Sequence, residues 1–366
     1  MKFTSNVQRL NQALSKVILA VSPRSTEPAL EGIHIVTTDN CVRLTGFNTE
    51  LCITEEIEAV FTEAGAVVVP AKFFTDIVRK CKNENITIEV DEKLIINITS
   101  GNSKYTLVGI DALQFPETPK VTEVNNLRLM QKDFCKAIGE VLFSVATTDD
   151  KPVYTGVLFD IANSRLTLVA MDGFRLAMCK INSKAAADTS FIVPAKALSE
   201  LLKLVKPDDT EMTINVSQQH ILINVENTTF ISRLIEGEFI DYNSAIPKDT
   251  RLTVRVNRQE FLSSIERTSL IINDKLKNPL VLSFEENSAK MSCVTTIGKA
   301  SDECACETIG ESIRIGFNNK FLSDALKNTD TDEVRLELSG TLAPMRVLPP
   351  EGDDYLFLVL PMRLKD

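Results

Sequence analysis

The chain has 366 residues, of which 44% are hydrophobic and 25% are charged, as in ordinary globular proteins. This composition excludes collagen, coiled coil and disorder as descriptions of the whole chain. The formal net charge of −10 argues against nucleic acid as a ligand, because a negative field repels phosphate.

The first residues and the cysteines indicate where the protein works. The segment that begins Met1-Lys2-Phe3 has no apolar h-region, so we expect no signal peptide. No apolar run approaches the ~18–20 residues of a membrane span. The eight cysteines are scattered and include no C-x-x-C pair, which is typical of reduced thiols. We therefore expect a cytoplasmic protein without a membrane contact, a disulfide framework or a bound metal.

Three similar segments divide the chain into repeats. Segments 68–78, 192–202 and 316–326 align without gaps, and their matched lysines are 124 residues apart both times. These lysines are Lys72, Lys196 and Lys320. A helix upstream repeats as well, at Val7, Phe134 and Phe261, each 127 residues from the next. The spacing predicts three domains, at 1–124, 125–248 and 249–366, each large enough to hold its own core.

Each repeat has the same predicted order of elements. A short strand leads into an amphipathic helix, whose apolar residues in the first repeat follow a 3.6-residue period from Val7 to Val21. Alternating strands come next, then a second helix that begins after Pro70 or Pro194, and then more strands. The six helices are expected at 5–21, 71–82, 131–145, 195–206, 257–270 and 318–328. Two helices on antiparallel strands in every repeat predict an α+β fold.

The charge is distributed unevenly between these elements. The six helical segments together carry +8, so the rest of the chain carries −18. If the helices share one face, that face is positive and binds phosphate without reading sequence. The alternative is that these lysines belong to ordinary solvated helix faces.

Catalysis has little support in the sequence. Of the two histidines, His34 alternates with apolar residues in a predicted strand and His220 lies near a probable turn. The phosphate-binding, serine-nucleophile and zinc-protease motifs do not occur in the sequence. The missing motifs disfavour a second interpretation, in which the chain is an enzyme or a small-ligand binder with a cleft between repeats. A structural assembly protein with incidental basic helices is the third.

Two apolar stretches are unusual. The run from Tyr355 to Leu364 is either a terminal strand buried in a sheet or a strand that Pro361 stops, so that Met362 and Leu364 line an apolar groove. In the stretch 170–177, Gly173 predicts a tight turn between strands, with Phe174 and Arg175 beside it.

Several separated motifs, in the same order, resemble bacterial sliding clamps, the beta subunits of DNA polymerase III. They are Met1-Lys2-Phe3, Val69-Pro70-Ala71-Lys72, Asp172-Gly173-Phe174-Arg175-Leu176, Glu236-Gly237-Glu238-Phe239-Ile240-Asp241-Tyr242 and Pro361-Met362-Arg363-Leu364. The resemblance covers the whole chain. It implies a non-catalytic processivity factor without a cofactor, a head-to-tail homodimer whose six domains form a ring around double-stranded DNA.

The resemblance also implies site residues and partners. The DNA-facing residues are Arg24, Lys72, Arg79, Tyr154 and Lys196, and the charge distribution adds Lys80, Lys203, Lys206 and Lys320. A groove for peptides of the replicative polymerase alpha subunit, the clamp loader, other polymerases and repair proteins is formed by Met171, Gly173, Phe174, Arg175, Leu176, Ile240, Pro344, Leu358, Val359, Leu360, Pro361 and Met362. At the dimer interface, Tyr105 and Leu107 of one protomer meet Leu270 and Ile271 of its partner.

The sequence departs from the family pattern near this groove. Ile240 stands where proline is usual, Ser244-Ala245 replace a bulkier and more basic pair, and Phe174 replaces the histidine of some members. Lys365 and Asp366 extend past the usual Arg-Leu end. We expect these departures to change the shape and peptide preference of the groove rather than the fold.

Overall fold

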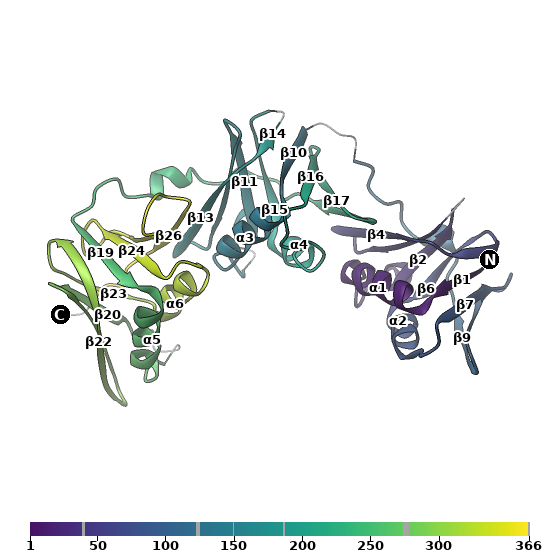
Figure 1. The fold of residues 1–366 in the computed structure, drawn as a ribbon, viewed down its shortest axis with the longest axis horizontal. Coiled ribbons are helices and arrows are strands. Elements are labelled where there is room, and N and C mark those ends of the chain that lie inside the picture. The colour runs from purple at the N-terminus through teal and green to yellow at the C-terminus, as the bar shows by residue number, and fades with distance from the viewer. Residues whose placement is uncertain (39–40, 122–124, 149, 186, 274–277, 365–366) are drawn as a thin grey trace. The chain divides into compact units, whose positions relative to one another are not determined.

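The computed structural model describes residues 1–38, 41–121, 125–148, 150–185, 187–273 and 278–364 (Figure 1). Lys365 and Asp366 lie outside these residues. Two compact units are formed, the first by 1–131 with 196–234 and the second by 132–195 with 235–366. The middle repeat therefore contributes to both units, and the domain boundaries drawn from the repeat spacing stay a prediction.

All six expected helices are present, and strands fill most of the chain between them. The first repeat contains β1 (Lys2–Asn6), α1 (Val7–Val17), β2 (Gly32–Thr37), β3 (Val42–Phe47), β4 (Leu51–Ile57), β5 (Val60–Glu63), β6 (Ala66–Pro70), α2 (Ala71–Lys80), β7 (Asn85–Val90), β8 (Ile95–Ser100) and β9 (Ser103–Val108). The second contains β10 (Asn125–Met130), α3 (Gln131–Leu142), β11 (Gly156–Ala162), β12 (Arg165–Met171), β13 (Arg175–Asn182), β14 (Lys184–Ala185), β15 (Thr189–Pro194), α4 (Ala195–Leu201), β16 (Glu211–Val216), β17 (His220–Val225) and β18 (Thr228–Arg233).

The third repeat has the same two helices and ends in a buried strand. It contains β19 (Leu252–Asn257), α5 (Arg258–Ser269), β20 (Leu280–Glu285), β21 (Ser288–Thr295), β22 (Gly298–Gly310), β23 (Ile313–Phe317), α6 (Asn319–Lys327), β24 (Glu333–Leu338), β25 (Met345–Leu348) and β26 (Tyr355–Val359). Short 3₁₀ turns connect these elements at η1 (Ile18–Ala20), η2 (Pro28–Glu31), η3 (Ala112–Gln114), η4 (Pro152–Thr155) and η5 (Tyr242–Ala245). No helix in the described part of the chain is long and apolar enough to cross a membrane.

Local chemistry sets where the helices begin. The Asn6 side chain accepts hydrogen bonds from the first free N–H groups of α1, and Asn257 and Asn318 do the same for α5 and α6. The helices α2 and α4 begin directly after Pro70 and Pro194, as predicted. Because caps and prolines mark these starts, the sequence locates them closely.

The predicted helices differ from the structure in their alignment between repeats and in several of their ends. Val7 corresponds to Gln131 and not to Phe134, since each is the first residue of its helix, whereas Leu10, Phe134 and Phe261 are the equivalent buried residues at the fourth position. The helix expected at 195–206 ends at Leu201, where the backbone tightens through bonds to the third preceding carbonyl. Pro207 disfavours helical geometry in the residue before it.

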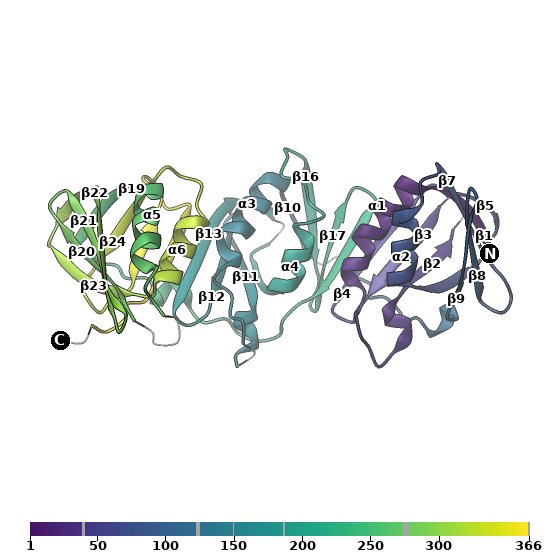
Figure 2. The ribbon, with the colours of Figure 1, turned by 90° about the horizontal axis from the view of Figure 1, so that it is seen from below.

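In the first unit, two sheets surround one helix pair. One sheet has the strand order β5-β1-β7-β8-β9, and the second runs β10-β16-β17-β18-β4-β3-β2-β6. The helices α1 and α2 lie side by side in Figures 1 and 2, and α1 packs its buried face on β3 and β4. The pairing of β18 with β4 joins strands of the second and first repeats into a continuous sheet.

In the second unit, one long sheet contains strands of both the second and the third repeats. Its order is β15-β11-β12-β13-β26-β25-β24-β19-β22-β21-β20-β23. The β13–β26 pair crosses from one repeat to the next, and α5 and α6 contact each other beside it. The long strand β22 pairs with β21 through residues 298–305 and with β19 through 306–310, so it turns from one layer into the other.

A buried ionic contact reinforces the β4–β18 junction. The Lys16 ammonium lies 2.9 Å from a Glu55 carboxylate oxygen and donates to the Thr228 hydroxyl at 3.0 Å. The Thr228 hydroxyl donates in turn to the other Glu55 oxygen. Glu55 is only 6% exposed, so each of its two oxygens has replaced water by a protein donor.

We predict that Glu55→Ala lowers the free energy of unfolding by about 2 kcal/mol, because Lys16 and Thr228 lose their common acceptor. The matched control is Glu56→Ala, which removes an exposed pair with Arg43 on the opposite face and should cost about 0–1 kcal/mol. Urea unfolding followed by circular dichroism measures both. Equal shifts of the midpoint would contradict a structural role for the Glu55 contact.

Candidate functional site

An apolar groove of about 410 Å³ lies in the second unit, where the second and third repeats meet. Its floor comes from the ends of β12, β13 and β26, its sides from the β24–β25 loop and the C-terminal tail. It is lined by Met171, Gly173, Arg175, Leu176, Ala245, Thr341, Leu342, Pro344, Leu358, Leu360, Pro361, Met362 and Arg363. Apolar side chains dominate this lining, so the groove is suited to apolar anchors of a ligand.

The tail that forms one side of the groove is held by its backbone. The Leu360 N–H donates to the Phe174 carbonyl at 3.0 Å, and the Met362 N–H donates to the Gly316 carbonyl at 2.8 Å. Of the two alternatives for the run 355–364, each holds in part: β26 is a buried strand, and Met362 after it lines the groove, whereas Leu364 does not and lies against Gly316 instead.

The same backbone contact recurs in all three repeats. Val68 bridges to Ile110, Ile192 to Ile235, and Gly316 to Met362. In each case a segment that leaves the repeat crosses an edge strand, namely β6, β15 or β23. In the first two repeats this segment leads to the next repeat. In the third repeat it leads to the last residues of the chain.

The structure brings most of the predicted groove residues together, with three exceptions. Val359 is buried in the sheet, where it pairs with Arg175 and Met345, and it does not line the groove. Ile240 is exposed but does not line the groove. Phe174 lies beside the groove and stacks on Phe321 of α6, with ring centroids 6.2 Å apart.

The sequence interpretation missed Thr341, Leu342 and Arg363, and it named Ala245 only as a departure. Leu342 is 78% exposed in the loop between β24 and β25, which also contains Gly340. A large apolar side chain in a turn-forming segment is the signal that would have identified it.

The turn next to the groove depends on the Asp172 carboxylate. One Asp172 oxygen accepts the N–H groups of Phe174 and Arg175 at 2.9 and 3.0 Å, which closes the turn. Gly173 has a φ of +90°, a backbone angle that glycine adopts readily. The predicted turn between β12 and β13 is therefore confirmed.

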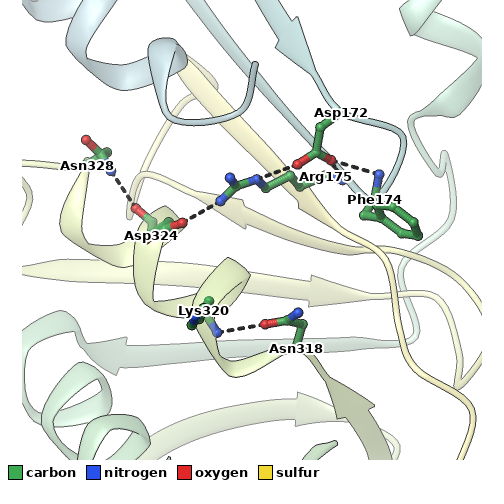
Figure 3. A network of polar contacts seen from close by, with 7 residues as sticks. All are labelled: Asp172, Phe174, Arg175, Asn318, Lys320, Asp324 and Asn328. Carbon is green, nitrogen blue, oxygen red and sulfur yellow. Dashed lines mark hydrogen bonds and ion pairs between the residues drawn. The ribbon is translucent and has the colours of Figure 1, made fainter. Parts of the chain in front are cut away.

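The Arg175 guanidinium is engaged inside the protein, as Figure 3 shows. It donates to Asp172 at 3.0 Å and to Asp324 of α6 at 2.5 Å. The rings of Phe321 and Phe143 lie 4.7 and 5.5 Å from its central carbon. The Arg175 side chain is only 13% exposed, so it forms a fixed part of the groove wall.

The basic residues proposed from the sequence are exposed, but several are paired. Arg79 pairs with Asp76, Lys203 with Glu200 and Lys206 with Glu226, at 2.5 to 2.7 Å. The Glu226 carboxylate raises the pKa of Lys206.

The charge on the six helices is also smaller than expected. Because Lys82, Lys203 and Lys206 lie past the ends of their helices, the helices within their observed bounds carry +5, compared with the expected +8.

Other basic residues keep their charge available. Within the described residues, Arg24, Lys72, Lys80 and Lys196 have no ion pair, and all four are exposed. Lys72, Lys196 and Lys320 are each the second residue of a helix, so the three repeats place them equivalently. Tyr154 is partly buried, with its ring edge-on to Phe239 at 5.6 Å.

The four residues expected at a dimer interface lie on an edge strand or directly after a helix. Tyr105 and Leu107 share a face of β9, the edge strand of the five-stranded sheet. Leu270 follows α5 with 84% of its side chain exposed, and Ile271 comes next. Residues 298–305 of β22 also form a sheet edge, since among the described residues they pair with β21 alone.

The ionisable groups with shifted pKa values are explained by burial and local contacts in the part of the chain that the structure describes. His34 stacks on Phe115 at 4.8 Å and burial lowers its pKa, while burial and Arg233 lower the pKa of His220. Burial raises the pKa of Cys179, whose thiol donates to Glu140. Among the described residues, no cluster of His, Cys, Asp or Glu is placed to hold a metal ion.

Family models match almost the whole chain in three consecutive parts. They are described as the N-terminal, central and C-terminal domains of the DNA polymerase III beta subunit, and they match residues 1–119, 128–241 and 243–363. A beta sliding clamp of Staphylococcus epidermidis is 34% identical over 99% of both chains.

Solved structures agree over the same length. The DNA polymerase sliding clamp of Bacillus subtilis matches with a TM-score of 0.97 and 30% identity, over 100% of both chains. A sliding clamp of Pseudomonas aeruginosa bound to griselimycin matches with a TM-score of 0.95 and 29% identity, again over 100% of both chains. These matches confirm the expected α+β fold of three domains.

We predict that Gly316→Ala loosens the tail beside the groove. A methyl group there would lie 2.6 Å from the Leu364 side chain and 3.1 Å from the Met362 carbonyl, so the tail must move. Trypsin should cleave after Arg363 about fivefold faster, which corresponds to about 1 kcal/mol of easier local opening.

The control for this variant is Gly139→Ala on α3, where an added methyl group has no neighbour within 4 Å. It should stabilise the helix by about 0.5–1 kcal/mol and leave cleavage of the tail unchanged. Unchanged cleavage in Gly316→Ala would show that the Gly316 contact does not hold the tail.

Proposed function

This chain belongs to the DNA polymerase III beta subunit family, and we propose that two copies close head to tail into a ring around double-stranded DNA. Its function is that of a DNA sliding clamp for DNA polymerase III. The observation that carries the proposal is the match of all three family domains, in order, along the chain. Topological linkage to DNA then needs no chemical step, so we assign the protein a non-catalytic role without a cofactor, in the cytoplasm.

The contact with DNA is proposed to be electrostatic and independent of sequence. Lys72, Lys196 and Lys320 are exposed and equivalent in the three repeats, and each lies in the first turn of a helix, where the helix dipole adds positive potential. Arg24, Arg79, Lys80, Tyr154, Lys203 and Lys206 are assigned to the same surface. Since phosphate contacts of this kind carry no sequence information, the ring is free to slide.

The ring is proposed to close through unpaired strand edges. The edge of β9 in one protomer would pair with residues 298–305 of β22 in its partner, and Tyr105 and Leu107 would cover Leu270 and Ile271. The support is that β9 and this part of β22 each have one ladder partner, while Leu270 exposes a large apolar surface.

The groove is proposed to recruit partners through short peptides. Leu342, Leu358 and Met362 line it with apolar surface, which suits the leucine and phenylalanine anchors of a linear motif. The partners we assign are the replicative polymerase alpha subunit, the clamp loader, and other polymerases and repair proteins that carry such peptides.

The DNA surface is tested by reversing one lysine in each repeat. We predict that a variant with Lys72→Glu, Lys196→Glu and Lys320→Glu binds a labelled DNA duplex more weakly than the parent protein. The log–log salt slope should also become shallower, by about 0.9 for each phosphate that the variant no longer neutralises. Fluorescence anisotropy at several salt concentrations measures both quantities.

The matched control reverses Lys93, Lys184 and Lys290, which are exposed, lie one in each repeat and are outside the proposed surface. This control changes the net charge by the same amount and should leave most of the affinity and the slope intact. If the two triple variants lose affinity and salt slope equally, the DNA does not bind at the helix surface that carries Lys72, Lys196 and Lys320.

A further inference from the structure

Asp324 is a residue of α6 that does not line the groove but holds a residue that does. Its carboxylate accepts a hydrogen bond from Arg175 at 2.5 Å, across the boundary between the second and third repeats (Figure 3). Arg175 lines the groove directly after the turn that carries Phe174. The position of this groove wall therefore depends on a contact between residues 149 positions apart in the chain.

The helix that carries Asp324 is itself fixed at both ends. The Asn318 side chain accepts the Lys320 N–H at 2.9 Å and caps the first turn, and the Asn328 side chain donates to the Asp324 carbonyl at 2.8 Å (Figure 3). The Phe321 ring, one turn before Asp324, lies against the guanidinium of Arg175 and stacks on Phe174. Asp324 thus presents its carboxylate to Arg175 from a rigid support.

The charges at this wall do not balance. One guanidinium faces two carboxylates, those of Asp172 and Asp324, so the formal sum is −1. Arg363 also lines the groove, is exposed and has no ion pair among the described residues, so the free positive charge lies on the tail. A ligand that places a carboxylate beside Arg175 meets a guanidinium already satisfied by two acids.

We propose that Asp324 is a positioning and specificity-determining residue of the groove. It fixes Arg175 as a wall, gives that wall a formal charge of −1 together with Asp172, and so makes the groove prefer peptides that are uncharged rather than negative at this position. This inference rests on the proposed peptide-binding function and adds a residue and an electrostatic preference to it.

The test uses two synthetic peptides and the full-length protein. The first is a fluorescein-labelled ten-residue peptide whose only large side chains are one Gln, two Leu and one Phe. The second replaces Gln by Glu, which adds a negative charge and keeps the shape. Fluorescence anisotropy gives the Kd of each peptide, and the ratio of the two values measures the preference for the uncharged ligand.

The variants are Asp324→Asn, Asp324→Glu and Asp330→Asn. Asp330 is the matched control, because its carboxylate pairs with Lys136 at 3.1 Å across the same repeat boundary without contacting the groove. We expect Asp324→Asn to weaken binding of the first peptide by about threefold to tenfold and to lower its preference over the Glu peptide by a similar factor. Asp324→Glu should keep the preference of the parent protein, because it keeps the carboxylate. Asp330→Asn should change neither the affinity for the first peptide nor the preference.

Three results would overturn the inference. Unchanged affinity and preference in Asp324→Asn would do so, provided that its thermal midpoint shows a folded protein. An equal effect of Asp330→Asn would assign the change to the repeat boundary as a whole. Failure of the parent protein to bind either peptide would overturn the proposed groove function together with this inference.

Discussion

A strand at the edge of a sheet leaves N–H and C=O groups unpaired, and in this chain neighbouring repeats satisfy each other's edges. The β4–β18 ladder joins the first repeat to the second, and the β13–β26 ladder joins the second to the third. Three repeats in one chain make two such junctions, and within the described ranges β9 and residues 298–305 of β22 have no second partner. The proposed head-to-tail ring gives these two edges to each other.

The groove has its origin in the same threefold plan. In every repeat the departing segment crosses an edge strand, at Ile110, Ile235 or Met362. The third segment borders the groove with its apolar residues Leu360, Pro361 and Met362. The junction beside it supplies the other wall, where Arg175 is held by Asp172 and Asp324. The groove therefore lies beside the β13–β26 junction between the second and third repeats.

Much of this organisation was predictable from the sequence because local chemistry determines it. The equal spacing of Lys72, Lys196 and Lys320, the caps and prolines before the helices, and the turn at Gly173 all depend on nearby residues. The first helix was aligned three residues out of place, since a slip of nearly one turn keeps the same apolar face. The family resemblance is confirmed by the matched models.

The features that the sequence did not reveal depend on contacts between distant segments. Arg175 was expected in the groove, but its pairing with Asp324 joins two repeats and has no local signal. Leu342 and Arg363 reach the groove only because β24, β25 and the tail meet there. Likewise, Glu226 lies outside the helices and pairs with Lys206, which a sum of charges along the helices does not show.

The most direct test of the ring is retention on DNA with and without free ends. The protein, loaded by a clamp loader onto a nicked circular plasmid, is passed through a gel-filtration column before and after a restriction enzyme cuts the plasmid once. We predict that the protein stays with the circle and is lost from the cut DNA, because a ring slides off an end. Equal retention on both forms, or equal loss from both, would contradict a ring that encircles DNA.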